Sequence, residues 1–244
     1  FPSYFLIFII YHRVKMNQKN DLQFNIDFNV YRPFGPSVLH ANLPQILVDN
    51  INMVADEILQ DDKLRQEKDY SQNLAGNVKY EVQFPLEKLP PFGDTLTKLV
   101  SGYVDNVLTE KEKPEGDYNL GYKVWLVSQY AGDFNPVHIH DANLSGVMFL
   151  KLPEKYEEEY RREDHHATVG CLEFLGAMPG HFSKHSYLVK PEIGDVYLFP
   201  SHLAHQVYPF RSEGERRSLA FNVHFSLKQQ SDQPVKDARS LGAV

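Results

Sequence analysis

The fold is decided by residues 216–226, RRSLAFNVHFS, in which large apolar residues alternate with small or polar ones after the two arginines. A period of two is the pattern of a β-strand that is buried on one face. We expect Leu219 and Phe221 to pack under covering helices. Arg216 and Ser218 then stand on the opposite face, where they line a cavity.

Short strands of this kind recur through the second half of the chain. From Pro114 onward, β-branched and aromatic runs alternate with turn residues and no helical period is present. Eight strands are expected, a number typical of a jelly roll: 122–130, 137–140, 144–152, 168–174, 186–189, 195–199, 204–208 and 218–226. The charged segment 153–166 is expected to be a solvated excursion between two of them.

The first half of the chain adds helices. Apolar residues recur at intervals of three and four in residues 43–60 and 94–110, which predicts two amphipathic helices, the second capped by Asp94. Alternation predicts strands at 22–34 and 78–84. The sequence therefore indicates a mainly β, cupin-like double-stranded β-helix whose N-terminal helices pack on one sheet.

The expected organisation is a single domain over residues 16–244. Residues 1–15 are apolar, precede Met16 and are expected to be a non-native or upstream extension. The domain divides into three parts: helices with flanking strands at 22–113, the jelly-roll core at 118–227 and a C-terminal tail at 228–244.

Charge and cysteine content exclude several classes of protein. The net charge is −7, from 25 basic and 32 acidic residues, which does not favour binding to nucleic acid or to an anionic membrane. The single cysteine, Cys171, excludes an intramolecular disulfide framework and is compatible with a reducing compartment, so a cytoplasmic location is expected. The oligomeric state cannot be predicted.

The most informative motif is the pair His138 and His140. Residues i and i+2 of a strand point to the same face, so both imidazoles can reach one metal ion while Ile139 packs behind them. His205, directly after an apolar strand, is the best candidate for a third ligand. Taken alone, a His-x-His pair is more often hydrogen-bonded or surface-exposed than bound to metal.

The arginine of the deciding strand suggests a second binding function. Because a turn at 212–214 precedes it, the strand is expected to be the hairpin partner of the His205 strand. Arg216 could then hold the far carboxylate of an extended dicarboxylate whose near end chelates the metal. The alternative is an arginine that reaches out to solvent at a sheet edge.

Taken in order, these segments resemble the 2-oxoglutarate and Fe(II)-dependent oxygenases. The resemblance covers residues 120–227 and is carried by the His-x-His pair, LSGVMFL at 144–150, GDVYLFPS at 194–201, His205 and ERRSLAFN at 215–222. It implies a double-stranded β-helix that uses Fe(II), 2-oxoglutarate and O2 to hydroxylate an unidentified small-molecule or peptide substrate.

The resemblance also implies roles for individual residues. His138, His140 and His205 correspond to iron ligands, and Arg216 with Ser218 corresponds to the pair that binds the C5 carboxylate of 2-oxoglutarate. We also consider Tyr130, Asn143 and Tyr197 as residues that could contact the cosubstrate.

One departure from the family pattern concerns the second ligand. Most members have an acid there, giving two histidines and one carboxylate, whereas this chain has His140. Asp141 could take the place through a bulge, or His140 could be the first ligand with Ala142 leaving a vacant position.

Two other functions remain open. A cupin-type metal dioxygenase or isomerase would use the three histidines without needing Arg216. A non-catalytic jelly-roll binding module would need none of these residues.

Overall fold

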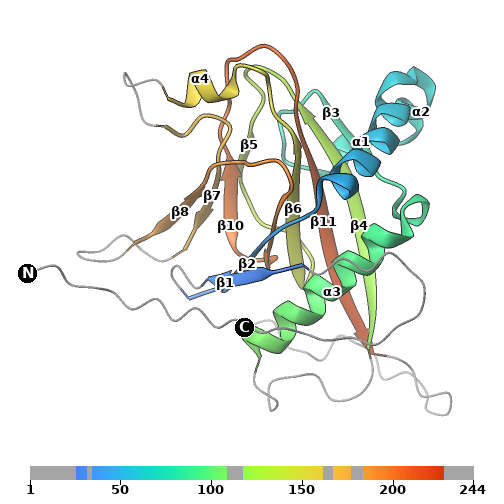
Figure 1. The fold of residues 1–244 in the computed structure, drawn as a ribbon, viewed down its shortest axis with the longest axis vertical. Helices are drawn as coiled ribbons and strands as arrows, with labels where there is room; N and C mark the ends of the chain where they lie inside the picture. The colour runs from blue at the N-terminus through green and yellow to red at the C-terminus, as the bar shows by residue number, and fades with distance from the viewer. Residues whose placement is uncertain (1–25, 32–34, 109–117, 162–166, 177–183, 228–244) are drawn as a thin grey trace, which may run out of the picture.

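The computed structural model describes residues 26–31, 35–108, 118–161, 167–176 and 184–227. Within these ranges the strands form two antiparallel sheets (Figure 1). The larger sheet has the spatial order β1 (Phe28–Tyr31), β2 (Val38–Asn42), β9 (Asp195–Pro200), β6 (Leu144–Lys151), β11 (Arg216–Leu227), β4 (Tyr118–Gln129) and β3 (Tyr80–Gln83). The smaller sheet has the order β5 (Asn135–His138), β10 (Ala204–Val207), β7 (Leu172–Leu175) and β8 (Ser186–Val189). This mainly β, two-sheet jelly roll confirms the predicted fold class.

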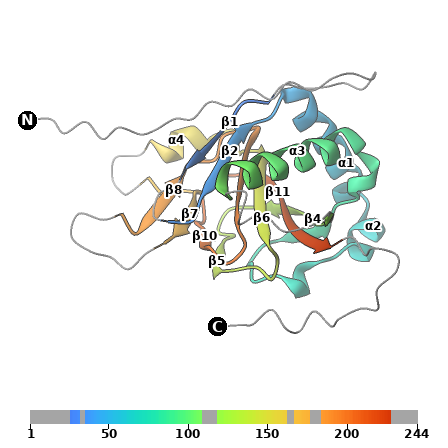
Figure 2. The same ribbon diagram turned by 90° about the horizontal axis from the view of Figure 1, so that it is seen from below.

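Two long helices lie along one side of the larger sheet (Figure 2). They are α1 (Gln45–Gln60) and α3 (Pro90–Val107). The shorter elements are α2 (Asp62–Glu67), α4 (Tyr156–Tyr160) and the 3-10 turns η1 (Ser71–Asn73) and η2 (Leu86–Lys88). Each long helix buries the apolar stripe that its sequence predicted, so the two helices and the sheet share one hydrophobic core.

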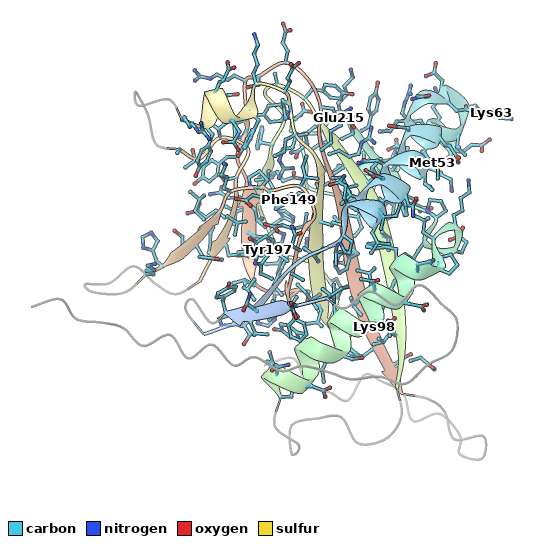
Figure 3. All side chains as sticks on the ribbon, viewed as in Figure 1. Met53, Lys63, Lys98, Phe149, Tyr197 and Glu215 are labelled. Atoms are coloured by element: carbon cyan, nitrogen blue, oxygen red, sulfur yellow. The ribbon has the colours of Figure 1, made fainter. Side chains whose placement is uncertain are left out.

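The alternation of β11 separates this core from the space between the sheets. Leu219 and Phe221 are buried in the core under the helices, as expected. On the other side of the larger sheet, a second buried cluster packs between the sheets, and Figure 3 shows Phe149 and Tyr197 there. One strand therefore supplies apolar atoms to the helices and polar atoms to the interior of the roll.

The connection before β11 differs from the prediction. β11 pairs with β4 and β6 in the larger sheet, whereas β10 pairs with β5 and β7 in the smaller one. The expected hairpin between the His205 strand and β11 is therefore wrong. The turn at 212–214 carries the chain from one sheet to the other, as connections in a jelly roll commonly do.

Several further details differ from the sequence-based expectations or fall outside the described residues. α3 begins at Pro90, whose fixed φ suits the first helical position, so Asp94 is not its cap. The charged segment after β6 is not wholly solvated, because α4 buries Tyr156 and Glu159. Strand β2, which lies between β1 and β9 and pairs with both, was not predicted. Residues 1–15, expected to be an extension, and residues 228–244, expected to be a tail, lie outside the described residues.

Candidate metal centre and its cavity

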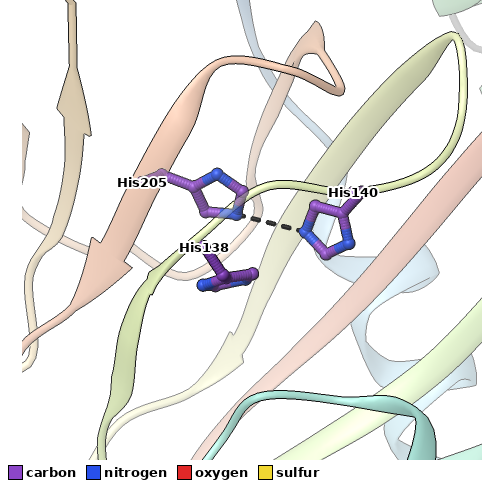
Figure 4. Close-up of side chains that lie close together, drawn as sticks. All are labelled: His138, His140 and His205. Atoms are coloured by element: carbon purple, nitrogen blue, oxygen red, sulfur yellow. Dashed lines mark hydrogen bonds between the residues drawn. The ribbon is translucent and has the colours of Figure 1, made fainter.

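Three histidines meet at the open end of the smaller sheet (Figure 4). His138 ends β5 and lies directly opposite His205 of β10 in the strand register. His140 follows β5, where its backbone N–H donates to the carbonyl of Ser201 at 2.9 Å. One nitrogen from each ring lies within 4.8 Å of the others. The structure thus brings together all three histidines singled out in the sequence, which we call the histidine triad. Ile139, expected to pack behind them, is instead 61% exposed.

Backbone carbonyls orient two of the rings. Nδ1–H of His138 donates to the carbonyl of Pro136 at 2.7 Å, and Nδ1–H of His205 donates to that of Leu203 at 2.9 Å. Because a carbonyl only accepts, Nδ1 carries the proton and the lone pair of Nε2 is left for another partner. Nε2 of His205 lies 3.2 Å from Nε2 of His140 (Figure 4).

Burial keeps the triad uncharged at neutral pH. It lowers the pKa of His138, it lowers the pKa of His140 to about 4, and it lowers the pKa of His205 to about 3. The neighbouring histidines add to the effect on His140 and His205. Neutral imidazole is the form that binds Fe, Zn, Cu or Ni, so the three converging nitrogens could hold such an ion.

A carboxylate ligand is not part of this cluster. Asp141 is exposed, and within the residues that the structure describes the group of mutually close ligand atoms contains only the triad. The donor set therefore fits a divalent transition metal with three neutral nitrogens.

The triad faces a cavity enclosed between the two sheets. Its empty space, counted out to the open mouth and including the solvent there, is about 850 Å³. The polar and aromatic side chains that line it away from the triad include Glu81, Trp125, Gln129, Asn135, Arg216 and Ser218.

Arg216 enters this cavity as a buried cation. Its side chain is 1% exposed, Nε donates to the carbonyl of Gly170 at 3.1 Å, and Nη1 donates to Oε1 of Gln129. Nη2 is buried and has no hydrogen-bond partner among the described residues. Burial lowers the pKa of Arg216 to about 10, so the guanidinium still carries its charge at neutral pH. An orphaned, charged N–H group in a cavity is suited to a carboxylate.

Arg217 lies on the opposite face of β11. It donates to Glu215 through Nε and Nη2, both at 2.8 Å, and Nη2 also reaches Asp56 of α1 at 2.7 Å. The expectation that Arg216 rather than Arg217 faces the cavity is therefore confirmed. Arg217 instead links α1 to the sheet through its ion pair with Asp56, whose side chain is half exposed.

The other three residues considered for the cosubstrate do not line the cavity. The ring of Tyr130 lies under the ammonium of Lys79, at 4.5 Å, and Asn143 uses its Oδ1 to accept from the backbone of Phe225. Tyr197 stacks on His40 with centroids 4.7 Å apart, toward the β2 end of the sheet. Each of these side chains has a structural partner elsewhere.

Sequence reasoning did not single out Glu81, Trp125 or Asn135. A signal for Glu81 was available, because Val82 belongs to the core and its neighbour in a strand must then face the other side. What the sequence could not show is that β3 joins the edge of the larger sheet beside β4.

The cavity-forming region matches a known protein family. Residues 123–222 match the family described as "Putative 2OG-Fe(II) oxygenase". This finding agrees with the resemblance seen in the sequence and confirms it. No curated protein sequence matches the chain significantly.

Several solved structures are similar to this chain at low sequence identity. A prolyl-4-hydroxylase from Pseudomonas putida is 15% identical, with a TM-score of 0.48, and the match covers 79% of this chain and 93% of that one. AviO1 from Streptomyces viridochromogenes is 16% identical, with a TM-score of 0.47 and coverage of 81% and 92%. The α-ketoglutarate-dependent carbocyclase SnoK is 12% identical, with a TM-score of 0.49 and coverage of 77% and 79%.

The described helices were also compared with the requirements of a membrane span. Among them, none is long and apolar enough to cross a bilayer.

Proposed function

Residues 123–222 belong to the 2OG-Fe(II) oxygenase family, and on that premise we propose that the protein couples decarboxylation of 2-oxoglutarate to succinate with hydroxylation of a second substrate. The family is one of oxidoreductases that use Fe(II), 2-oxoglutarate and O2. The substrate that receives the hydroxyl group is a small molecule or a peptide.

The histidine triad is the proposed iron site. One ring nitrogen of each histidine lies within 4.8 Å of the others, the rings are neutral, and two of them are held in place by backbone carbonyls. When bound there with 2-oxoglutarate, Fe(II) supplies the capacity to activate O2. The protein's own contribution is to fix the three nitrogens and to surround them with buried walls that limit access of water.

Arg216 and Ser218 are the proposed partners of the C5 carboxylate of 2-oxoglutarate. The observation that carries this assignment is the buried, unpartnered Nη2 of Arg216, which lines the same cavity as the triad. Ser218 stands two residues along the same face and is 3% exposed, so its hydroxyl can add a hydrogen bond. The two groups would hold the extended dicarboxylate with its keto-acid end toward the triad.

The all-histidine ligand set keeps one alternative under consideration. A three-histidine cupin-type dioxygenase or isomerase would need the triad but not Arg216. Turnover of 2-oxoglutarate separates the two functions, because only the oxygenase forms succinate.

The experiment measures iron binding and succinate formation in the same preparations. Arg216→Ala should lower the affinity for 2-oxoglutarate by about 10- to 100-fold, while the iron content stays at the wild-type level. Arg216→Lys keeps the charge but loses the planar guanidinium group, so its affinity for 2-oxoglutarate should lie between those of the wild type and Arg216→Ala. Arg161→Ala is the control, since Arg161 is 79% exposed and equal in charge. An iron-loaded wild type that neither binds nor decarboxylates 2-oxoglutarate would reject the proposal.

We also place the protein in a reducing compartment such as the cytoplasm. The support is Cys171, the single cysteine, whose thiol is free and fully buried.

A further inference from the structure

Glu81 is a buried carboxylate for which the protein itself provides no adequate partner. It lies on β3, is 2% exposed and lines the same cavity as the histidine triad. Neither carboxylate oxygen receives a hydrogen bond of good geometry from the described residues. Burying a carboxylate without partners is costly, and native structures rarely leave one so. The partner of Glu81 is therefore expected to arrive with a ligand.

The alternation of side chains along β3 directs Glu81 into the cavity. Val82 points into the helix-covered core, so Glu81 must face the interior of the roll. The loop beside it passes very close: a Cβ at Gly76 would lie 2.7 Å from Oε1 of Glu81 and 2.6 Å from Nδ2 of Asn135. A larger residue there would displace the end of one of these side chains.

The surroundings of Glu81 are negative. Burial is the main reason that the pKa of Glu81 is raised to about 7; the amide of Asn135 opposes the rise, and Asp69 and Asp133 increase it. Two more carboxylates therefore act on this side of the cavity. The exposed residues Asn73 and Ala75 also line the cavity, so its mouth lies on the same side. Glu81, Asp69 and Asp133 together favour a cationic ligand over an anionic one.

An aromatic wall accompanies the carboxylate. Trp125 lies on β4 beside β3, is 3% exposed and lines the cavity. Its ring centroid is 5.8 Å from that of His140 and 5.9 Å from that of Tyr70, so the indole lies beside the triad. The face of an indole attracts ammonium and guanidinium groups, most strongly where water is excluded.

We propose that Glu81 and Trp125 form the recognition site for a cationic nitrogen of the hydroxylated substrate, either an ammonium or a guanidinium group. The substrate is then a basic side chain or a small amine, and its cationic end lies at β3 while the carbon to be hydroxylated lies near the triad. This inference rests on the proposed function, because it assigns the second substrate of that reaction.

The single tryptophan makes the site directly observable. Trp125 is the only tryptophan in the chain, so intrinsic fluorescence reports on this wall alone. The protein is titrated without O2, so that no turnover occurs, both in the presence and in the absence of Fe(II) and 2-oxoglutarate. The probes are n-butylammonium and n-propylguanidinium, each compared with its neutral counterpart, n-butanol or n-propylurea.

The cations should change the emission saturably, and the neutral counterparts should bind about tenfold more weakly or worse. Glu81→Gln should lower the affinity for the cations by about tenfold or more without changing the affinity for the neutral probes. Glu81→Asp, which keeps the charge, should retain part of the preference. Glu87→Gln is the matched control, because Glu87 is exposed on η2 and does not line the cavity.

Several results would overturn the inference. Equal affinity for cations and neutral probes, or cation binding that survives Glu81→Gln, would remove Glu81 as a recognition group. If Glu81→Gln instead lowers the affinity for iron and leaves the affinity for the cations unchanged, the role of Glu81 is to balance the charge of the metal. Equilibrium dialysis of the wild type with iron and 2-oxoglutarate tests the proposed function separately. If both bind but the cations do not, only this inference fails. If the cations bind but iron and 2-oxoglutarate do not, the proposed function fails.

Discussion

Glu81→Gln should make the metal-free protein more stable at alkaline pH. The substitution replaces an ionisable group by a neutral one of nearly the same shape, at a position where the amide of Asn135 is near but makes no hydrogen bond of good geometry. In the wild type, the native state holds this carboxyl with its pKa raised from 4.5 to about 7, mainly by burial. The native state therefore binds more protons than the unfolded state between these two pH values.

The sign and size of the effect follow from this difference. Stability of the wild type is lost as pH rises from about 4.5 to 7, because ionising Glu81 is harder in the folded protein. With about 1.4 kcal/mol for each pKa unit, the full loss is about 3 kcal/mol, an upper limit because water can enter the open cavity. Glu81→Gln avoids that loss, so its advantage should be small at pH 5 and reach roughly 2 to 3 kcal/mol at pH 8.5.

Urea unfolding followed by far-ultraviolet circular dichroism at several pH values measures this advantage. Glu87→Gln removes the same charge from an exposed position and should run parallel to the wild type throughout. An advantage of Glu81→Gln that is equal at pH 5 and pH 8.5 would mean that shape, not ionisation, causes it. No advantage at any pH would mean that Glu81 has a partner in the folded protein.

Three further outcomes follow from the structure. Alanine at any one residue of the histidine triad should lower iron affinity by about tenfold or more, measured by equilibrium dialysis, because each ring supplies one of three converging nitrogens. Arg217→Ala should lower the unfolding free energy by roughly 1 to 3 kcal/mol, since Glu215 loses its hydrogen bonds from Arg217 but keeps those from Ser128 and Lys151, yet leave the affinity for 2-oxoglutarate unchanged. Gly146→Ala should also destabilise the fold in urea titrations, by about 1 to 3 kcal/mol, because its Cβ would lie 2.2 Å from the Phe221 ring and 2.8 Å from the carbonyl of Tyr197.

Features set by local spacing were predictable from the sequence. The alternation in β11 identified the face of Arg216, and the recurrence of apolar residues identified α1 and most of α3. Such patterns depend only on the geometry of a single element. They hold wherever that element is placed in the fold.

Features set by pairing between distant strands were not predictable in the same way. The turn before β11 suggested a hairpin with β10, but a short connection does not determine whether two strands share a sheet. In the jelly roll it joins the two sheets instead. Arg216 reaches the cavity because its sheet faces the histidine triad, not because its strand lies beside that of His205.

A chain of hydrogen-bonded side chains on one wall of the cavity connects Arg216 with the neighbourhood of Glu81. Arg216 donates to Oε1 of Gln129, Nε2 of Gln129 donates to Oδ1 of Asn135, and Nδ2 of Asn135 is thereby left on the side of Glu81. The amides are ordered from the cation to the anion and hold the two charges apart. On the two proposals made above, the C5 carboxylate of 2-oxoglutarate binds at Arg216 and the cationic group of the second substrate binds at Glu81.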